Sequence, residues 1–226
     1  MKKKILAIIL ARSGSKRIKN KNIKKLKNKP LIRWTIDRAV KSKKFCDIIV
    51  SSDSPKILKI AKSNNKNILA IKRPKKLSLD NSSSEDAALH ALQWYEKKYT
   101  KIDYIALLQP TSPFRTLKTI KKCIKEISDT QVKAVISVRK ADIKIDQKKE
   151  NFFYLDKTKF CKKLQFFKSF KSIYVINGIF YLFKKNFFIK NFSFKPPIFK
   201  PIIVSSRKEN IDIDTKKDWQ YAKKFI

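Results

Sequence analysis

Glycine is scarce in this sequence. The chain has two glycines in 226 residues, where average usage of about 7% would supply roughly sixteen. Gly14 lies in the polar segment that follows the apolar run Ile5–Leu10, and Gly178 follows Asn177 beside another apolar run. Glycine alone adopts a positive φ, or lets a backbone approach another group closely, at little cost. We therefore expect both glycines to occupy such positions.

Cysteine and long apolar runs are also rare. Cys46, Cys123 and Cys161 are odd in number, far apart and without metal-ligand spacing. This argues against a disulfide framework or a zinc site and favours reduced thiols in a cytoplasm. The start Met1–Lys4 and the apolar residues after it look like a signal peptide, but Arg12 ends that run, well short of the roughly 20 residues that a membrane helix needs. We expect a soluble, cytoplasmic protein with no membrane partner.

Acidic residues are few, because 18 Asp and Glu face 56 Lys and Arg, for a formal net charge of +38. Such an excess is typical of nucleic-acid-binding proteins, since clustered cations release counterions from a phosphate backbone. Here lysines occur in nearly every segment, which favours a general solvated lysine coat. We expect no nucleic-acid partner and keep a non-catalytic, basic nucleic-acid-binding protein as the alternative.

Short apolar runs alternate with segments of helical period from residue 5 to 138, which predicts an α/β fold with a mostly parallel sheet. The expected strands are 5–10, 47–50, 67–71, 104–108, 133–138, 174–183 and 202–204. The expected helices are 30–41, 55–62, 84–99, 117–128 and 216–225, with Pro30 in the first helical position and Ser54 as an N-cap. We expect one domain over 1–226, with ligands at the edge where the strands end.

Residues 140–174 break this alternation and are rich in Lys and Phe. Exposed aromatic side chains are typical of a partner surface. The same composition also fits a pair of ordinary hairpin strands that pack on the main core. Both interpretations are open.

A basic turn follows the first expected strand. Arg12 can direct two donors onto phosphate oxygens, and Lys16 and Lys21 supply point charges, while backbone N–H groups at the strand end add donors. The segment has neither the Walker A spacing nor the glycine pattern of dinucleotide-binding loops. It indicates a phosphate site of another kind, with an ordinary basic turn as the alternative.

Two carboxylates stand one residue apart near the end of the chain. In an extended stretch, Asp212 and Asp214 point to one face while Ile211 and Ile213 point to the other. Mg²⁺ binds through one or two carboxylates together with substrate phosphates. The spacing therefore indicates a magnesium site, and the alternative is that Asp214 or Thr215 caps the last helix.

Two further polar loops follow expected strands. Leu107–Arg115 contains two prolines that favour a rigid loop, and Gln109 within it can pair with a base edge through a donor and an acceptor. Ser51–Ser54 holds the same place after the second strand, where a serine-rich helix cap is an equally good interpretation. His90, in the middle of an expected helix, is interpreted as structural.

Together these segments resemble the acylneuraminate cytidylyltransferases, also called CMP-sialic acid synthetases. The matching segments are 11–22, 29–32, 51–54, 73–80, 107–115, 177–178 and 211–215. The resemblance implies a three-layer, Rossmann-like fold of the nucleotide-diphospho-sugar transferase type. It also implies a homodimeric enzyme of surface glycan biosynthesis that joins a nonulosonic acid to CMP, using CTP and Mg²⁺ and releasing pyrophosphate. Residues 140–174 are then an inserted dimerisation and sugar-binding segment, with the dimer contact at 152–170.

The family's functional residues carry over position by position. The resemblance implies nucleotide ligands at Arg12, Ser15, Lys16, Lys21, Asn22, Arg73, Ser82, Ser84 and Gln109. It implies sugar ligands at Gln109, Asn177 and Lys168, and metal ligands at Asp212 and Asp214. The expected catalytic residues are Arg12, Lys21, Asp212 and Asp214. Displacement at an anionic α-phosphorus needs charge neutralisation and alignment more than a covalent nucleophile.

The sequence departs from the family where the sugar carboxylate is expected to bind. The family's His-Pro pair has no counterpart in 139–149, and lysines such as Lys168 and Lys171 replace an arginine-rich segment in 162–174. A lysine pairs with a carboxylate without a bidentate fork. The sugar is therefore open between N-acetylneuraminate and the related legionaminate or pseudaminate. A 3-deoxy-manno-octulosonate cytidylyltransferase or another sugar nucleotidyltransferase is the enzymatic alternative.

Overall fold

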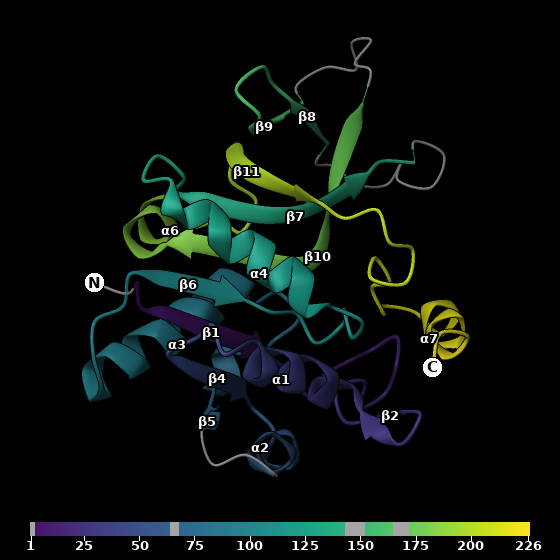
Figure 1. Cartoon of the computed structure of the whole chain (residues 1–226). Helices are drawn as coiled ribbons and strands as arrows, with labels where there is room; N and C mark the ends of the chain where they lie inside the picture. The colour runs from purple at the N-terminus through teal and green to yellow at the C-terminus, as the bar shows by residue number, and fades with distance from the viewer. Residues whose placement is uncertain (1–2, 64–67, 143–151, 165–171) are drawn as a thin grey trace.

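The computed structural model describes residues 3–63, 68–142, 152–164 and 172–226, in which a nine-stranded sheet lies between helices (Figure 1). The strands are β1 (Ile5–Leu10), β2 (Lys25–Leu26), β3 (Lys29–Pro30), β4 (Asp47–Ser52), β5 (Ile68–Lys72), β6 (Tyr104–Leu107), β7 (Ala134–Lys140), β8 (Phe153–Leu155), β9 (Cys161–Lys163), β10 (Ile173–Lys184) and β11 (Ile198–Ile203). The helices are α1 (Leu31–Ser42), α2 (Pro55–Lys62), α3 (Ser84–Lys98), α4 (Leu117–Lys125), α6 (Lys185–Asn191) and α7 (Lys216–Lys223), with 3-10 turns η1 (Lys75–Leu77) and η2 (Glu126–Ser128). Strands β2 and β3 form a separate small hairpin.

The order of the main sheet is β5-β4-β1-β6-β10-β7-β11-β9-β8. Strands β5, β4, β1 and β6 run parallel, as the alternation of strands and helices predicts. Strand β10 runs antiparallel between β6 and β7, and it also pairs with β8, so this side of the sheet curls back on itself. The sheet is parallel on the β1 side and mixed on the β10 side.

Helices cover both faces of the sheet, which gives three layers. On one face, α1, α2 and α4 bury Ile36, Ile57 and Ile120. On the other face, α3 and α6 bury Leu92 and Phe188. Alternate side chains of β1 enter the two clusters, because successive residues of a strand point to opposite faces.

Most helices begin at a side-chain cap that the sequence provides. The caps are Ser54 for α2, Ser83 for α3, Thr116 for α4 and Thr215 for α7. Each side-chain oxygen accepts a backbone N–H that the first helical turn leaves without a partner. Helix α1 differs from the expectation, because Pro30 belongs to β3 and precedes the helix instead of occupying its first turn.

The described part of 140–174 forms a hairpin in the main sheet. Strand β9 pairs with β11, and β8 pairs with β9 and β10. Phe153 is fully buried, and its ring meets Phe199 edge-on. The hairpin alternative is therefore correct for these residues, whereas residues 165–170 of the predicted dimer contact lie outside the described residues. Helix α6 was not predicted, because its mixture of Lys, Asn and Phe has no clear helical period.

Strands β1, β6 and β7 point toward the side of the sheet where α7 lies (Figure 1). Trp219 and Ala222 attach α7 there by packing with Ile18, Leu26 and Phe114. The C-terminal segment thus lies against the loops that follow the parallel strands. None of the described helices has the length and apolar character needed to cross a membrane.

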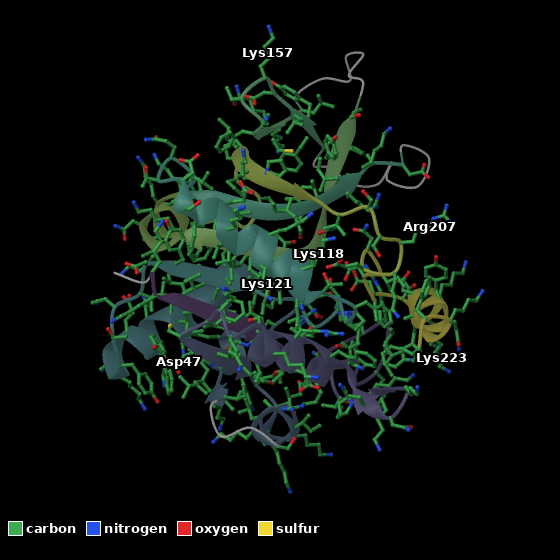
Figure 2. All side chains as sticks on the ribbon, viewed as in Figure 1. Asp47, Lys118, Lys121, Lys157, Arg207 and Lys223 are labelled. Carbon is green, nitrogen blue, oxygen red and sulfur yellow. The ribbon has the colours of Figure 1, made fainter. Side chains whose placement is uncertain are left out.

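Lysines lie at the surface of widely separated elements. Figure 2 labels Lys118 and Lys121 on α4, Lys157 between β8 and β9, and Lys223 on α7, and all four are exposed. This distribution agrees with a general lysine coat.

Candidate active site

The basic turn after β1 is held in shape by Asp53, which follows β4. Asp53 accepts hydrogen bonds from the backbone N–H and the hydroxyl of Ser13, at 2.9 and 2.5 Å. Burial works to raise the pKa of Asp53, but the Ser13 hydrogen bonds outweigh it and keep that pKa below its usual value. On the other side of the turn, Asn22 donates to the carbonyl of Arg12 at 2.9 Å. The loop after β4 therefore supports the turn in addition to capping α2.

Asp80 bridges two of the predicted phosphate ligands. Its carboxylate lies 2.9 Å from Nη1 of Arg12 and 2.5 Å from Nζ of Lys16. The hydrogen bond from Lys16, followed by the nearby positive charges, lowers the pKa of Asp80 below its usual value. Arg12 also donates to the carbonyl of Leu79 at 2.9 Å. A carboxylate of the protein itself is thus paired with two of the cations that are expected to hold phosphates.

Lys21 connects the turn to the C-terminal segment. Its ammonium group lies 2.8 Å from Oδ1 of Asp214 and donates to the carbonyl of Ile213 at 2.8 Å. The Lys21 side chain is 13% exposed, against 51% for Asp214. Two predicted catalytic residues from opposite ends of the chain therefore meet in one ion pair.

The paired carboxylates project from an extended segment, as predicted. Ile211 and Ile213 are buried in the cluster beside α7, and the alternate residues Asp212 and Asp214 line a cleft. Thr215 caps α7 in a reciprocal capping box with the third residue of that helix. Because Thr215 fills the capping role, Asp214 is not the cap and its carboxylate is directed to the cleft.

This cleft, of about 590 Å³, lies between the basic turn, the loop after β6 and the C-terminal segment. The predicted site residues that line it are Arg12, Ser15, Lys16, Lys21, Asn22, Ser84, Gln109, Asp212 and Asp214. Cations from the turn and carboxylates from the C-terminal segment thus share one space. Such a set fits a polyphosphate that carries a divalent cation.

The two glycines of the chain differ in their surroundings. Gly178 has a φ of +79°, and a Cβ there would lie 2.9 Å from Oε1 of Gln109, so the expectation of a positive φ and a close approach is confirmed. Gly14 does not have a positive φ, and a Cβ there would meet nothing within 4 Å. The expectation of a positive φ is therefore wrong for Gly14, and no described part of the protein approaches its open side.

Two predicted nucleotide ligands lie outside the lining of this cleft. Arg73 is 5% exposed, and its Nε and Nη2 atoms have no hydrogen-bond partner within the described residues. Burial lowers the pKa of Arg73 below its usual value, although the negative charge of Asp53 acts to raise it. Ser82 donates its hydroxyl to the carbonyl of Lys76 at 2.8 Å. Arg73 therefore retains N–H donors at Nε and Nη2 that are unpaired in the described part of the chain, whereas the Ser82 hydroxyl forms its hydrogen bond within its own loop.

Asn177 is a buried link at the bulge in β10. Its Oδ1 accepts from the hydroxyl of Ser137 at 2.6 Å and from the N–H of Ile179 at 3.2 Å, and its Nδ2 donates to Asn210 at 2.8 Å. Asn177 is only 5% exposed, and it also contributes to the lining of a second cleft. Lys168, the third predicted sugar ligand, lies outside the described residues.

A second cleft, of about 880 Å³, adjoins the first and shares Asp212 and Asp214 with it. Three cations line it: Arg139 and Lys140 from the end of β7, and Arg207 from the loop before α7. Figure 2 labels Arg207. Neither arginine was predicted as a site residue, because neither belongs to a segment that resembles the family, whose arginine-rich segment is expected at 162–174.

The described side chains contain no group of three or more His, Cys, Asp or Glu that would hold a metal ion. Asp212 and Asp214 nonetheless fit Mg²⁺, which needs one or two carboxylates and takes its other oxygens from substrate phosphates and water. Both side chains open onto a cleft whose cations suit phosphate. The donor set therefore fits a metal that arrives with a polyphosphate.

The family assignment follows from comparison of the whole chain. A sequence profile for a protein family described as Cytidylyltransferase matches residues 6–226. The chain belongs to this family. The resemblance carried by the site segments is thus confirmed, and the cleft lies in a nucleotidyltransferase. Cytidylyltransferases are enzymes, in agreement with the expectation of an enzyme.

Curated relatives of this cytidylyltransferase are similar over nearly its full length. CMP-N,N'-diacetyllegionaminic acid synthase of Legionella pneumophila is 34% identical over 99% of this chain and 96% of the relative. N-acylneuraminate cytidylyltransferase of Escherichia coli O18:K1:H7 is 33% identical over 98% of this chain, which spans 52% of that relative. Pseudaminic acid cytidylyltransferase of Campylobacter jejuni is 30% identical over 97% of this chain and 95% of the relative.

Solved structures share the fold at low sequence identity. A CMP:2-keto-3-deoxy-manno-octonic acid synthetase complexed with CTP has a TM-score of 0.78 at 14% identity and covers 98% of each chain. 4-Diphosphocytidyl-2C-methyl-D-erythritol synthase from Anaerococcus prevotii has a TM-score of 0.68 at 19% identity, over 99% of this chain and 98% of that one. The cytidylyltransferase thus has the α/β fold of these nucleotidyltransferases.

Proposed function

We propose that this cytidylyltransferase transfers CMP from CTP to a nonulosonic acid and releases pyrophosphate. The observation that carries the proposal is the Lys21–Asp214 contact, which joins the phosphate-binding turn to the paired carboxylates in one cleft. The names of three relatives that match nearly the whole of this chain specify legionaminic, acylneuraminic and pseudaminic acids, and they support this sugar class.

In the proposed reaction, the anomeric oxygen of the sugar forms a bond to the α-phosphorus of CTP. The bond from that phosphorus to the bridging oxygen of the β-phosphate breaks, pyrophosphate leaves with the electron pair, and the hydroxyl proton goes to solvent. Arg12, Lys16 and Lys21 offset the charge that builds on pyrophosphate. Gln109 faces the base, and CTP displaces Asp80 from the two cations that it bridges.

We propose Asp212 and Asp214 as the residues that would hold Mg²⁺. When bound, this ion neutralises phosphate charge and favours displacement at phosphorus. Lys21 stays next to Asp214 and limits the net negative charge of the empty pair, so that the carboxylates do not repel an incoming triphosphate.

We assign the sugar acid to the second cleft, because that space meets the first at Asp212 and Asp214. Arg139 and Arg207 would offer the carboxylate the forked donors that lysine lacks. Arg207→Ala is expected to raise the KM for the sugar acid about tenfold, the cost of one charged hydrogen bond, while leaving the KM for CTP within a factor of two. An equal rise in both KM values would contradict this assignment.

We also propose that the enzyme is a cytoplasmic homodimer that supplies activated sugars for surface glycans. Three free cysteines agree with a reducing compartment. Leu155 on β8 and Ile198 and Ile203 on β11 are exposed apolar side chains that a second copy would cover. Light scattering should give twice the mass of one chain, and a monomer at micromolar concentration would refute the dimer.

The reaction is tested by measuring pyrophosphate release from CTP with Mg²⁺ across a panel of nonulosonic acids. Release should require both the sugar acid and the cation, and Asp212→Asn should abolish it. Pyrophosphate release without any sugar acid would favour another nucleotidyltransferase activity. Release with 3-deoxy-manno-octulosonate but with no nonulosonic acid would do the same.

A further inference from the structure

Arg115 is completely buried, and each of its donors serves a different segment of the site. Nε donates to the carbonyl of Ile179, which follows Gly178, and Nη2 donates to the carbonyl of Gln109 at 3.0 Å. Nη1 donates to the hydroxyl of Thr35 on α1 at 3.2 Å. Burial lowers the pKa of Arg115 to about 10, so the guanidinium remains positively charged at neutral pH. One buried cation therefore fixes the backbone on both sides of the Gln109–Gly178 contact.

Glu209 is the acidic partner in this region. It is 5% exposed, and its Oε1 accepts from the backbone N–H and the hydroxyl of Thr116, at 2.9 and 3.1 Å. Among the neighbouring groups, the charge of Glu209 acts most strongly to keep Arg115 protonated. Buried charges of opposite sign thus occupy the loop after β6 and the segment that leads to Asp212.

Two hydrogen bonds, one on each side of Asp212 in the sequence, connect its segment to the loop that carries Gln109. Glu209 contacts Thr116 at the end of that loop, and the N–H of Ile213 donates to the carbonyl of Thr111 at 2.8 Å. Movement of the C-terminal segment would therefore pull on the Gln109 loop, and the reverse.

Burying two charges of opposite sign is a poor way to gain stability, because the loss of hydration offsets most of the attraction between them. Apolar side chains of similar size would fill the same space at no greater cost. Arg115 and Glu209 do something that apolar residues cannot, since their hydrogen bonds hold three specified backbone groups at fixed separations.

We propose that Arg115 and Glu209 are positioning residues that couple the base pocket at Gln109 to the metal carboxylate of Asp212. The inference rests on the proposed function for the identity of the ligands, and it concerns binding, so that it can be tested without turnover. Neither residue touches the ligands. Their effect is on the relative placement of the two loops that do.

The coupling is measured by calorimetry of CTP with and without Mg²⁺, as the ratio of the two dissociation constants. Coupling between two sites is typically 5–150-fold, and we expect a ratio of about ten in the wild type. Glu209→Gln keeps an oxygen for Thr116 but removes the charge that faces Arg115, and should reduce the ratio to about two. Arg115→Lys keeps the charge but cannot reach three acceptors, and should behave similarly.

Glu96→Gln is the matched control. Glu96 also accepts a backbone N–H, from Ile102 at 3.0 Å, and pairs with a cation, Lys185, at 2.8 Å. Glu96 lies in the last turns of α3, whereas Ser84 at the other end of the same helix lines the cleft. This variant should lower the melting temperature and leave the coupling ratio at the wild-type value.

A wild-type ratio in folded Glu209→Gln and Arg115→Lys would overturn the proposal, as would a ratio of one in the wild type. If these variants do not fold, Glu209→Asp is used instead, because its shorter side chain keeps the charge but does not reach Thr116. An unchanged ratio in folded Glu209→Asp would also overturn the proposal. A wild type that couples CTP to Mg²⁺ but activates no sugar acid refutes the proposed function alone.

Discussion

The side-chain oxygen of Gln109 lies against Gly178, 2.9 Å from the position that a Cβ would take there. A residue with a side chain also pays about 1–2 kcal/mol for a left-handed backbone conformation, and Gly178 has a φ of +79°. Gly178→Ala should therefore displace Gln109 and weaken CTP binding about tenfold, the equivalent of one hydrogen bond. Calorimetry measures the affinity, and urea unfolding measures the stability.

Gly14→Ala is the control for this prediction. A Cβ at Gly14 meets nothing within 4 Å, and its φ is not positive. The stability of Gly14→Ala should equal or slightly exceed that of the wild type, because alanine restricts the unfolded chain. A larger loss of stability in Gly14→Ala than in Gly178→Ala would contradict the different roles of the two glycines.

Asp80 forms ion pairs with Arg12 and Lys16, and we expect it to compete with phosphate for these two cations. Asp80→Asn removes the competing charge and should tighten CTP binding about two- to fivefold, the range expected for exposed ion pairs. Asp156→Asn removes a similar ion pair, with Lys162 at 2.9 Å in the β8–β9 hairpin, and should leave CTP affinity unchanged. If Asp80→Asn binds CTP more weakly, Asp80 is a ligand or support of the nucleotide and not its competitor.

Lys21 is the least exposed of the three cations that are expected to hold phosphates, Arg12, Lys16 and Lys21. Lys21→Met keeps most of the side-chain volume and removes the charge next to Asp214. We expect kcat to fall about 10²–10³-fold, as for the loss of one preorganised donor to a developing charge. Lys162→Met, which breaks the partly exposed ion pair with Asp156, should retain wild-type kcat. Steady-state kinetics with CTP and a sugar acid compare the two variants. A wild-type kcat in Lys21→Met would remove Lys21 from the catalytic group.

His90 gives a pH prediction, since it is the one histidine of the chain. Burial, with a smaller effect of the Arg73 charge, lowers the pKa of His90 below its usual value. The unfolded chain then takes up a proton at a higher pH than the folded chain does, so the protein should lose stability as the pH falls through and below about 6.5. Proton NMR of the single imidazole should show the lowered pKa, and Arg73→Gln should move it upward. A His90 pKa above 6.5 would contradict the burial of this imidazole near Arg73.

Local patterns predicted most of the fold. The spacing of apolar runs located β1, β4, β6 and their helices, and Ser54 marked a true helix start. Long-range pairing was less accessible. That β10 inserts antiparallel between β6 and β7 depends on contacts between distant segments, which a period in one segment does not encode.

The site divides in a similar way. Charged residues in short motifs, such as Lys21 and Asp214, were identified and do meet. Glu209, Arg207 and Asp53 were not identified as site residues, because each acts through the position of its loop in space. Neighbouring residues of one motif also differ in their environment. The Ser82 hydroxyl forms a hydrogen bond within its own loop, whereas Ser84 lines the cleft.

Phosphorus NMR of CTP, Mg²⁺ and a legionaminic-type acid with the enzyme tests the central claim most directly. We predict a new phosphodiester signal from the CMP-sugar and one equivalent of pyrophosphate, both absent when the sugar acid is omitted. A spectrum in which no nonulosonic acid yields the phosphodiester, while CTP remains intact, would contradict the account.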